Sequence, residues 1–458
     1  MDKEIPRSFK FKTAPYEHQI TMLRYHISRP WSAEWGDFGI GKSKVACDLI
    51  RWRLEYKQAE KAIILAPANV LPSWKEELEK HSDLSYAIGD VPKRVPDVVV
   101  LSYDGLSWKW EKKAGERKRR MVMGQRLMQA LAMARNWKCQ LICDESTKVK
   151  TIKAHRTVSA ITLSDVCPFR IIMTGVPIPN DLLDIWSQIR IMDGGTHLGN
   201  NFYQWRYKNF FNRPWLPGKW NPKEDTLEKI KDLVGEVGIR FLRDDCLDLP
   251  DATYSIRWVK LSDEQRKIYE KLGTGNTFKI EGYPPIDLRY PMVRFTKRYE
   301  VLCGFLYFDK ERKHVFTFTK NPKHEAAKEM VEDWVQQDNK AVLYTAFREQ
   351  KNQLYDLFKG YAPTDDFIKF QGDEDRKLFI DHVSQGIGVQ LYRANLTGYL
   401  SNTFNFEDRV QSEARIRRIG QEKKQYYRDW LFDLHEDRRV YKCLREKKDV
   451  SQEVMSDK

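Results

Sequence analysis

The sequence GDFGIGKSKV occupies residues 36 to 45 and places three glycines next to a lysine and a hydroxyl residue, Lys42 and Ser43. Gly36, followed after four residues by Gly41, Lys42 and Ser43, satisfies the Walker A spacing, in which backbone N–H groups wrap phosphate groups. Only glycine lets the main chain approach an anion so closely. Residues 44–52 are expected to form a helix whose N-terminus points at the phosphates. The stretch predicts a triphosphate loop with Lys42 at the β and γ phosphates and Ser43 on Mg²⁺; a glycine-rich turn is the alternative.

A second motif, QLICDESTKVK at residues 140–150, supplies carboxylates. Residues 141–143 are expected to form a short buried strand that delivers Asp144 and Glu145 at its C-terminal end. Ligand sites in open α/β sheets lie at that edge. Asp144 is expected to hold Mg²⁺ and Glu145 to orient and deprotonate the attacking water, so the two motifs together predict a nucleotide hydrolase. An isolated Asp-Glu pair is usually a solvated strand end.

Short apolar runs alternate with helical stretches along the whole chain. Residues 31–35, 62–67, 98–103 and 169–175 are expected to be further strands of the first half. A second series is expected at residues 341–347, 367–372, 389–392, 399–402 and 426–432. The alternation predicts two α/β lobes with parallel sheets and helices on both faces.

The second half contributes EDRVQSEARIRRIGQ at residues 407–421. As one continuous helix ended by Gly420, it would present Gln411, Arg415 and Arg418 on a single face. Two guanidinium groups there are suited to stabilising charge on a γ-phosphate. The alternative is a basic surface helix.

The composition describes a globular chain with an excess of positive charge. Of the 458 residues 41% are hydrophobic, and 79 Lys and Arg face 65 Asp and Glu, a net charge of +14. The basic residues Lys112, Lys113, Arg117, Lys118, Arg119, Arg120 and Arg126 crowd one segment, which favours a polyanionic partner. The seven scattered cysteines indicate reduced thiols rather than disulfides or a zinc site. No apolar run long enough to cross a bilayer and no secretory signal is present, so a cytoplasmic protein without a membrane partner is expected.

Taken in order, the motifs resemble those of superfamily-two motors, and specifically the Swi/Snf-like DNA translocases. Gln19 in PYEHQI looks like the glutamine that reads adenine, and APANVLPSWKEELEKH, with Trp74, is similar to motif Ia. DESTKVK resembles the DEAH-type box, MTGVPIPNDLLDIWS motif III, and QSEARIRRIGQ the last motif. The resemblance spans residues 14 to about 450.

This resemblance implies an α/β fold of two RecA-like lobes, each a mainly parallel sheet flanked by helices. Lobe one is placed at residues 1–245 and lobe two at 246–458, with a helical insertion at about 262–315. It implies an ATP hydrolase coupled to translocation or unwinding of DNA, with ATP and Mg as cofactors. The implied catalytic residues are Lys42, Asp144, Glu145, Arg415, Arg418 and Gln411; the implied nucleotide-binding residues are Gln19, Gly36, Gly39, Gly41, Lys42 and Ser43, with Ser43 and Asp144 on the metal.

By analogy, the resemblance also implies largely sequence-independent contacts to a DNA backbone. The residues implied are Pro67, Asn69, Ser102, Tyr103, Thr174, Asn180, Thr345 and Gly372. The expected partner is duplex or branched DNA bound by a monomer, in replication, recombination or repair.

Some positions depart from the family pattern. Thr147 and Arg417 stand where histidines are usual, and residues 389–406 look like a shortened motif V. The compact length is most similar to bacteriophage versions, which implies a host cytoplasm. An RNA helicase and a nucleotide-gated DNA-binding scaffold with weak hydrolysis are the alternatives.

Residues 201–220 carry eight aromatic side chains interleaved with basic ones. Such interleaving suits stacking on unpaired bases or a wedge at a branch point. The alternative is that these aromatics pin an insertion onto the first lobe.

Overall fold

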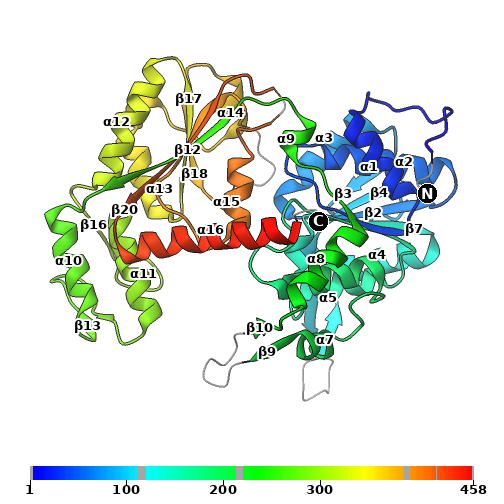
Figure 1. Cartoon of the computed structure of the whole chain (residues 1–458), viewed down its shortest axis with the longest axis horizontal. Helices are drawn as coiled ribbons and strands as arrows, with labels where there is room; N and C mark the ends of the chain where they lie inside the picture. Colours follow the sequence, from blue (N-terminus) through cyan, green and yellow to red (C-terminus); the bar gives the residue numbers. More distant parts are fainter. Residues whose placement is uncertain (1–3, 112–119, 213–219, 386–390, 419, 456–458) are drawn as a thin grey trace. The chain divides into compact units, whose positions relative to one another are not determined.

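The computed structural model describes residues 4–111, 120–212, 220–385, 391–418 and 420–455. Two compact units divide the chain (Figure 1). The first comprises Met1–Leu247 and Asp449–Lys458, and the second comprises Asp248–Lys448. In the described part of the chain, no helix combines the length and the apolarity needed to cross a membrane.

The first unit is built on a parallel sheet. Within the described residues its seven strands run in the order β11-β1-β8-β7-β2-β4-β3, and every neighbouring pair is parallel. All five strands predicted for this half are confirmed. The bounds are β1 Trp31–Glu34, β2 Lys61–Ala66, β3 Tyr86–Ile88, β4 Val98–Ser102, β7 Cys139–Asp144, β8 Phe169–Met173 and β11 Gly238–Ile239.

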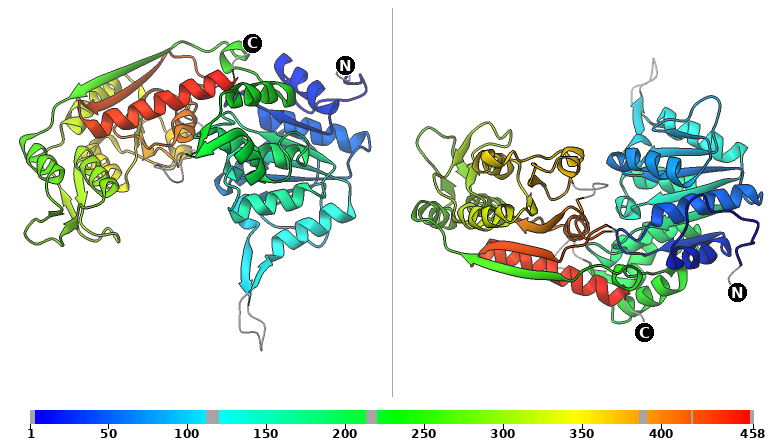
Figure 2. Two further views of the ribbon diagram at one scale, coloured as in Figure 1. Left: turned by 60° about the horizontal axis from the view of Figure 1, so that its bottom comes forward. Right: turned by 90° about the horizontal axis from the view of Figure 1, so that it is seen from above.

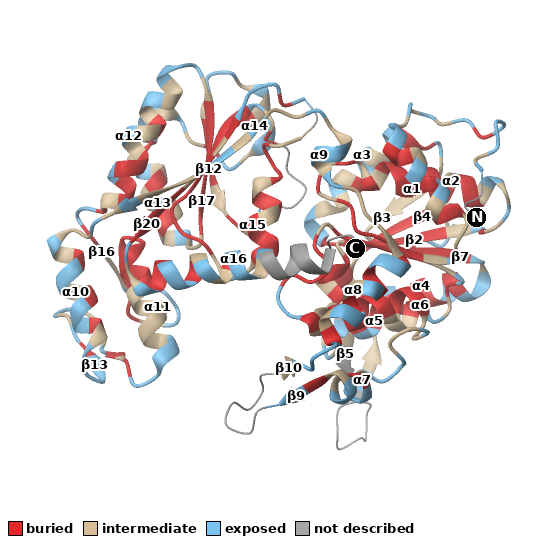
Figure 3. Cartoon of the chain, in the orientation of Figure 1, coloured by how far each residue is buried: buried red, intermediate tan, exposed pale blue. Residues whose placement is uncertain are grey.

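Alternating side chains on these strands form two separate cores, one on each face of the sheet, because successive residues of a strand point to opposite sides. Ile64 and Val100 pack with helices α1, α2 and α3, whereas Ile63 and Val99 pack with α4, α5, α6 and α8. The buried residues concentrate on the strands and the inner faces of the helices (Figure 3). The helices are α1 Glu17–Ile27, α2 Lys42–Glu55, α3 Leu71–His81, α4 Gln125–Asn136, α5 His155–Ser164, α6 Ile185–Asp193 and α8 Thr226–Val237.

The first unit also contains two small antiparallel strand pairs outside this sheet. The antiparallel strands β5 Trp108–Glu111 and β6 Arg120–Met123 project from the first unit as a hairpin (Figure 2). Helix α7 Phe202–Asn209 leads into the antiparallel pair β9 Phe210–Asn212 and β10 Trp220–Pro222. Of the predicted basic segment, Lys112, Lys113, Arg117, Lys118 and Arg119 lie outside the described residues, as does Trp215 of the predicted aromatic segment.

The second unit also holds a parallel sheet, whose five strands in the described residues run β12-β20-β19-β17-β18. Together the two sheets confirm the predicted fold class of two α/β lobes. The strands are β12 Ala252–Val259, β17 Lys340–Thr345, β18 Leu378–His382, β19 Ala394–Tyr399 and β20 Gln425–Phe432.

Three strand predictions in this half are wrong. Residues 367–372 form the helix α14, because Asp366 caps its first turn by accepting from the N–H groups of Ile368 and Lys369. The strand expected at residues 399–402 is β19, which ends at Tyr399. Of the strand expected at 389–392, residues 389 and 390 lie outside the described residues, and the chain enters β19 only at Ala394. The stretch interpreted as a shortened motif V therefore contains a core strand.

Helices cover both faces of the second sheet. Leu343 and Ile380 pack with α12 Pro322–Gln336 and α13 Arg348–Leu357, while Val342 and Phe379 pack on the opposite face with Phe370 of α14. The remaining elements are α9 Arg243–Cys246, α10 Asp263–Gly273, α11 Pro291–Leu302, α15 Phe406–Glu413, α16 His435–Met455 and the ladders β13 Thr277–Phe278 with β14 Ile286–Asp287 and β15 Phe305–Tyr307 with β16 Val315–Thr317.

Candidate nucleotide site

The glycine loop connects β1 to α2 and closes around a lysine. Gly39 and Gly41 both have φ of 89°, a left-handed conformation that favours glycine. Lys42 opens the 14-residue α2, and its Nζ donates to the carbonyls of Gly36 at 2.8 Å and Asp37 at 3.0 Å. The loop thus places an ammonium group and a helix N-terminus together, an arrangement that fits phosphate groups. Ser43 directly follows Lys42 in the sequence and is half-buried in the first turn of α2.

Helix α1 holds the loop from one side. The Gln19 Nε2 donates to the Ile40 carbonyl at 3.1 Å, and the His18 Nε2 lies 2.9 Å from the same oxygen. Gly41 has a φ of 89°, and a β-carbon there would lie 2.2 Å from the Gln19 Nε2, so a side chain at this position would be strained and would displace the Gln19 amide. Gln19 is therefore packed against the loop, and its reading of adenine stays a prediction.

The strand register brings Asp144 to the edge of the sheet from which the loop emerges. Glu34, the last residue of β1, pairs with Met173 of β8, and Met173 pairs with Asp144, the last residue of β7. Two strand spacings separate the ends of β1 and β7, roughly 10 Å. Burial raises the pKa of Asp144, and the nearby Lys42 charge opposes that rise. The two motifs therefore share the carboxyl edge of one sheet, where α/β proteins bind ligands.

Asp144 is a buried carboxylate held in one orientation. Trp74 of α3 donates its indole N–H to the Asp144 Oδ2 at 2.9 Å, and the Glu145 N–H donates to Oδ1 at 3.0 Å. Burial raises the pKa of Asp144 above its ordinary value, while Trp74 and Lys42 oppose the rise. The Asp144 carbonyl accepts from the Tyr103 hydroxyl at 2.7 Å. A single oriented carboxylate near a phosphate loop is the donor set that Mg²⁺ uses together with phosphate oxygens.

Glu145 follows in an unusual backbone conformation. Its φ of 48° is left-handed, which is uncommon for a residue with a side chain and recurs at functional sites. The turn redirects the chain into the short helix η3 Ser146–Val149, in which Thr147 is buried. The Ser146 hydroxyl donates to Gln188 of α6 at 2.7 Å, so the carboxylate motif is anchored to the helix that follows motif III.

The loop that follows β8 contains motif III and lies at the same carboxyl edge of the sheet. Gln188 Nε2 donates to the Pro177 carbonyl at 2.7 Å, which connects this loop to the carboxylate motif. A β-carbon at Gly175 would lie 2.7 Å from the Phe38 ring, so Phe38 of the glycine loop packs on the main chain of motif III. The glycine loop, the carboxylate motif and motif III are therefore linked by direct packing or hydrogen bonds.

The predicted DNA-contacting residues of the first unit divide by exposure. Asn69 and Asn180 are exposed, and Ser102 is half-buried with its Oγ accepting from the Gly105 N–H. Pro67 is buried; so is Tyr103, 2% exposed, whose hydroxyl donates to the Asp144 carbonyl.

The remaining two hydroxyl residues of that set are also buried. Thr174 accepts from the Val176 N–H, and Thr345 of the second unit donates to the Phe347 carbonyl. These groups and the Tyr103 hydroxyl have hydrogen-bond partners inside their own unit, and their contact with a DNA phosphate stays a prediction. Gly372, at the end of α14, is exposed, and its contact with DNA stays a prediction.

The arginine motif of the second unit differs from its predicted form. Helix α15 ends at Glu413, so Arg415 and Arg418 do not continue one helical face from Gln411. Groups from elsewhere accompany the end of the helix: the Tyr427 hydroxyl donates to the Glu413 carbonyl at 2.8 Å, and, two residues beyond the helix, the Leu391 N–H donates to the Arg415 carbonyl at 3.0 Å. Gly420, with φ of 94°, lies well beyond the end of the helix and does not terminate it.

The two arginines nevertheless share one neighbourhood. Burial raises the pKa of the Tyr344 phenol, and the charges of Arg415 and Arg418 both oppose that rise. Arg415 is buried, whereas Arg418 is half-buried with its Nε donating to the Ala414 carbonyl at 3.1 Å. Gln411 is buried and donates to Glu407 within α15 at 3.2 Å.

Several supporting residues escaped the sequence analysis. Glu34 is buried at the edge beside the site, 3.3 Å from the His26 ring, and its charge raises the pKa of Asp144. In the second unit Arg409 makes two hydrogen bonds to Asp429, at 2.7 and 2.9 Å. No spacing rule in the sequence marks these residues, although the position of Glu34 just before the glycine loop is a signal.

Comparisons with known proteins identify the family of the chain. The family model of the SNF2-related domain matches residues 35–285. Protein p41 of Acyrthosiphon pisum secondary endosymbiont phage 1 is 23% identical, over 90% of this chain and 89% of its own length. YwqA of Bacillus subtilis (strain 168), provisionally named an ATP-dependent helicase/translocase, is 23% identical over 92% of this chain and 46% of its own.

The chain thus spans nearly all of the phage protein and about half of the Bacillus one. Among solved structures, the Sulfolobus solfataricus SWI2/SNF2 ATPase core in complex with dsDNA is 17% identical, with a TM-score of 0.45, covering 99% of this chain and 95% of that one. The family model matches more than half of the chain, from the start of the glycine loop through the carboxylate motif and motif III. The chain belongs to the SNF2-related family, among the superfamily-two Swi/Snf-like ATP-dependent motors.

Proposed function

We propose that this protein is an ATP-driven DNA motor that moves along duplex or branched DNA. The observation that carries the proposal is the shared sheet edge, where a lysine-centred glycine loop and the oriented Asp144 carboxylate meet. Membership of the SNF2-related family supports an ATP-dependent motor. The coupling of hydrolysis to movement along DNA is the new part of the proposal.

In this proposal the first unit binds Mg-ATP. Lys42 and the N–H groups of the glycine loop bind the phosphates, Gln19 recognises the base, and Ser43 and Asp144 hold the metal ion. Magnesium bound there would neutralise charge on the β and γ phosphates. Glu145, directed by its left-handed backbone, orients and deprotonates the attacking water.

Arg415 and Arg418 are proposed to stabilise the charge that develops on the γ-phosphate during hydrolysis. Arginine suits this role because it stays charged and donates from a planar fork. Gln411, close by in sequence, is proposed to assist in the same step. Closing and reopening of the nucleotide site would then drive one step along the DNA backbone.

The DNA partner is proposed from charge and from the exposed polar residues. A net charge of +14 favours a polyanion through counterion release. Asn69, Ser102, Asn180 and Gly372 are proposed as backbone contacts without sequence preference. The likeness to p41 over most of its length supports a phage origin. We propose that the chain acts, as a monomer, on DNA during replication, recombination or repair in a host cytoplasm.

The test measures ATP hydrolysis by the full chain with single-stranded, duplex, forked and Holliday-junction DNA, and with RNA. DNA is expected to stimulate turnover, most strongly when branched, and Lys42→Ala or Glu145→Gln is expected to abolish it. Displacement of a third strand from a triplex by the moving protein reports translocation directly.

Three outcomes would contradict the proposal. Stimulation by RNA alone would make the chain an RNA motor. DNA binding without turnover would make it a scaffold. Equal turnover on blunt and branched duplexes would remove the preference for branched DNA.

A further inference from the structure

Helix α7 carries two different faces, one aromatic and one polar. Tyr203, 42% exposed, and Tyr207, 62% exposed, are four residues apart and so share the outer face. Between them the Arg206 guanidinium lies 3.9 Å from the centre of the Trp220 ring. The Tyr207 ring meets the Trp220 ring edge-on at 5.1 Å. This packing holds the tyrosines in place and leaves much of Tyr207 open to solvent.

The aromatic side chains of this segment divide into a buried set and an exposed set. Phe202, Trp205 and Phe210 pack into the core of the first unit, and Trp205 and Phe210 are buried there. Tyr203, Tyr207 and Phe211 are exposed instead. The segment therefore both anchors itself and presents aromatic rings.

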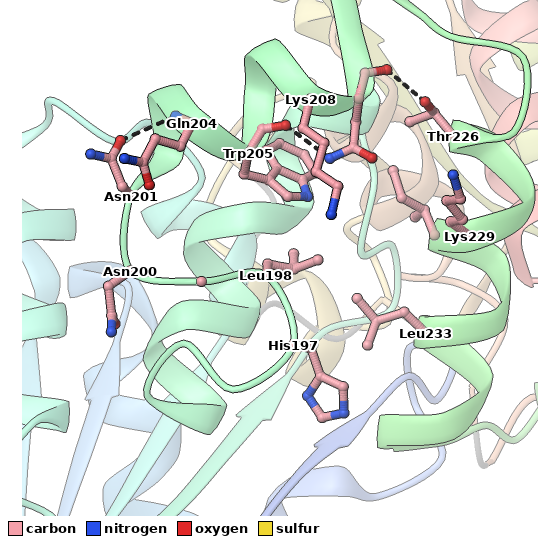
Figure 4. A pocket seen from close by; sticks show the side chains of 13 residues that line it. His197, Leu198, Asn200, Asn201, Gln204, Trp205, Lys208, Thr226, Lys229 and Leu233 are labelled. Carbon is pink, nitrogen blue, oxygen red and sulfur yellow. Dashed lines mark hydrogen bonds between the residues drawn. The ribbon is translucent and has the colours of Figure 1, made fainter.

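The polar face of α7 forms one wall of a pocket of about 510 Å³. Helix α8 forms the facing wall, and the residues that follow α6 form the base (Figure 4). The apolar lining is Leu198, Trp205, Ile230 and Leu233; the polar lining includes His197, Asn200, Asn201, Gln204, Lys208 and Lys229. A volume in this range suits one small organic group, such as a nucleotide.

The pocket offers hydrogen-bonding groups that nothing else in the described chain uses. The side chains of Asn200, Gln204 and Lys208 have no hydrogen-bond partner among the described residues, whereas Lys229 is paired with Asp225 at 2.9 Å. Of the two lysines that line the pocket, Lys208 is therefore the one whose charge can bind a ligand. It lies four residues from Gln204, on the same face of α7.

This pocket is separate from the nucleotide site. His197, which lines it, meets the Trp31 ring edge-on at 5.4 Å, and Trp31 is the first residue of β1. The glycine loop leaves β1 after Glu34, at the other end of the strand. Because the strands are parallel, the pocket lies at the amino edge of the sheet, opposite the edge that holds Asp144.

We propose that α7 is a second binding site for a nucleic-acid strand, which takes unpaired nucleotides. Tyr207 and Tyr203 stack bases, Lys208 binds a phosphate, and the pocket receives a base between Trp205 and the amide of Gln204. Stacking platforms beside cations are the usual means of holding single strands without sequence preference. The inference rests on the proposed DNA motor and adds to it a contact with the unpaired part of a branched substrate.

The experiment measures binding of a fluorescein-labelled oligothymidylate to the full chain by fluorescence anisotropy, without nucleotide. Tyr207→Ala is expected to weaken binding at least about five-fold, the lower range for loss of one stacked base. Lys208→Ala is expected to reduce the slope of log affinity against log salt by about 0.7, the loss of one phosphate contact on a single strand. Tyr290→Ala, at a tyrosine that is 63% exposed in the second unit, is the matched control and should bind as wild type.

Each result bears on one proposal only. Binding by Tyr207→Ala and Lys208→Ala that equals the wild type would overturn the α7 site, even with an active motor. Photocrosslinks from a 4-thiothymidine oligonucleotide that avoid residues 202–209 would overturn it as well. Turnover stimulated by a blunt duplex should be the same in both variants as in the wild type, and its absence in the wild type would instead contradict the motor.

Discussion

Replacing Trp74 by phenylalanine tests whether the orientation of Asp144 depends on its indole partner. The indole N–H donates to the Asp144 Oδ2 at 2.9 Å, and the two side chains are 1% and 7% exposed. A hydrogen bond to a charged group contributes about 1.5–3 kcal/mol, and phenylalanine has no donor with which to replace it. We expect the free energy of unfolding to fall by that amount beyond the loss caused by the smaller ring.

Trp52→Phe measures the loss caused by the smaller ring alone. Trp52 is 4% exposed, and its indole N–H has no hydrogen-bond partner among the described residues. Both substitutions remove the same part of a buried ring, so the difference between them isolates the hydrogen bond to Asp144.

The assays are urea unfolding and the pH dependence of ATP turnover. Since the indole lowers the pKa of Asp144, its removal raises that pKa further, and the ionised carboxylate is then reached only at higher pH. The acid limb of turnover should therefore move to higher pH in Trp74→Phe and stay in place in Trp52→Phe. Equal destabilisation of the two variants with an unmoved acid limb would refute the reasoning.

Three further predictions concern the second unit. Gly398→Ala places a β-carbon 2.5 Å from the Trp430 ring, and urea unfolding should show a loss of about 1–3 kcal/mol from overpacking. Arg409→Lys cannot make both hydrogen bonds to Asp429, and the same assay should show a loss of at least about 1.5 kcal/mol, whereas an unchanged midpoint would contradict the pairing. Burial, and to a lesser extent the Lys323 charge, lowers the pKa of His324 from 6.5 to about 3. Below pH 6.5 the unfolded chain therefore binds more protons than the folded one, and the free energy of unfolding decreases as the pH falls. From pH 7 to 5 the wild type should lose about 2 kcal/mol more than His324→Gln, and parallel profiles would count against this.

The first half of the fold was largely predictable because its signals are local. Strands such as residues 62–67 are continuous apolar runs, which indicate strands buried on both faces of a parallel sheet. Asp144 follows such a run, so its place at the carboxyl edge needed only the polarity of the strand. The spacing of Gly36, Gly41 and Lys42 likewise placed the loop at the start of α2.

The second half was harder because its local signals conflict with its contacts. β18 was missed because its run is short and ends in Asp381 and His382, and β12 because polar residues interrupt it at the sheet edge. Residues 414–418 are good helix formers, yet α15 ends before them. The carbonyl of Glu413, its last residue, accepts from Tyr427, and the Arg415 carbonyl just beyond it accepts from Leu391. No local pattern reveals the positions of these two donors.

Features that depend on neighbours along the chain could be predicted from the residues alone: the glycine loop, the helix behind it, the buried strands and the carboxylates at a strand end. Which polar groups remain exposed to a ligand depends on contacts between residues far apart in the sequence. Tyr103 and Thr174 carry the same hydroxyl chemistry as a phosphate contact, but folding places them against partners inside the first unit. The reason is that a hydrogen bond depends on position in space, and residues far apart in sequence compete for each donor and acceptor.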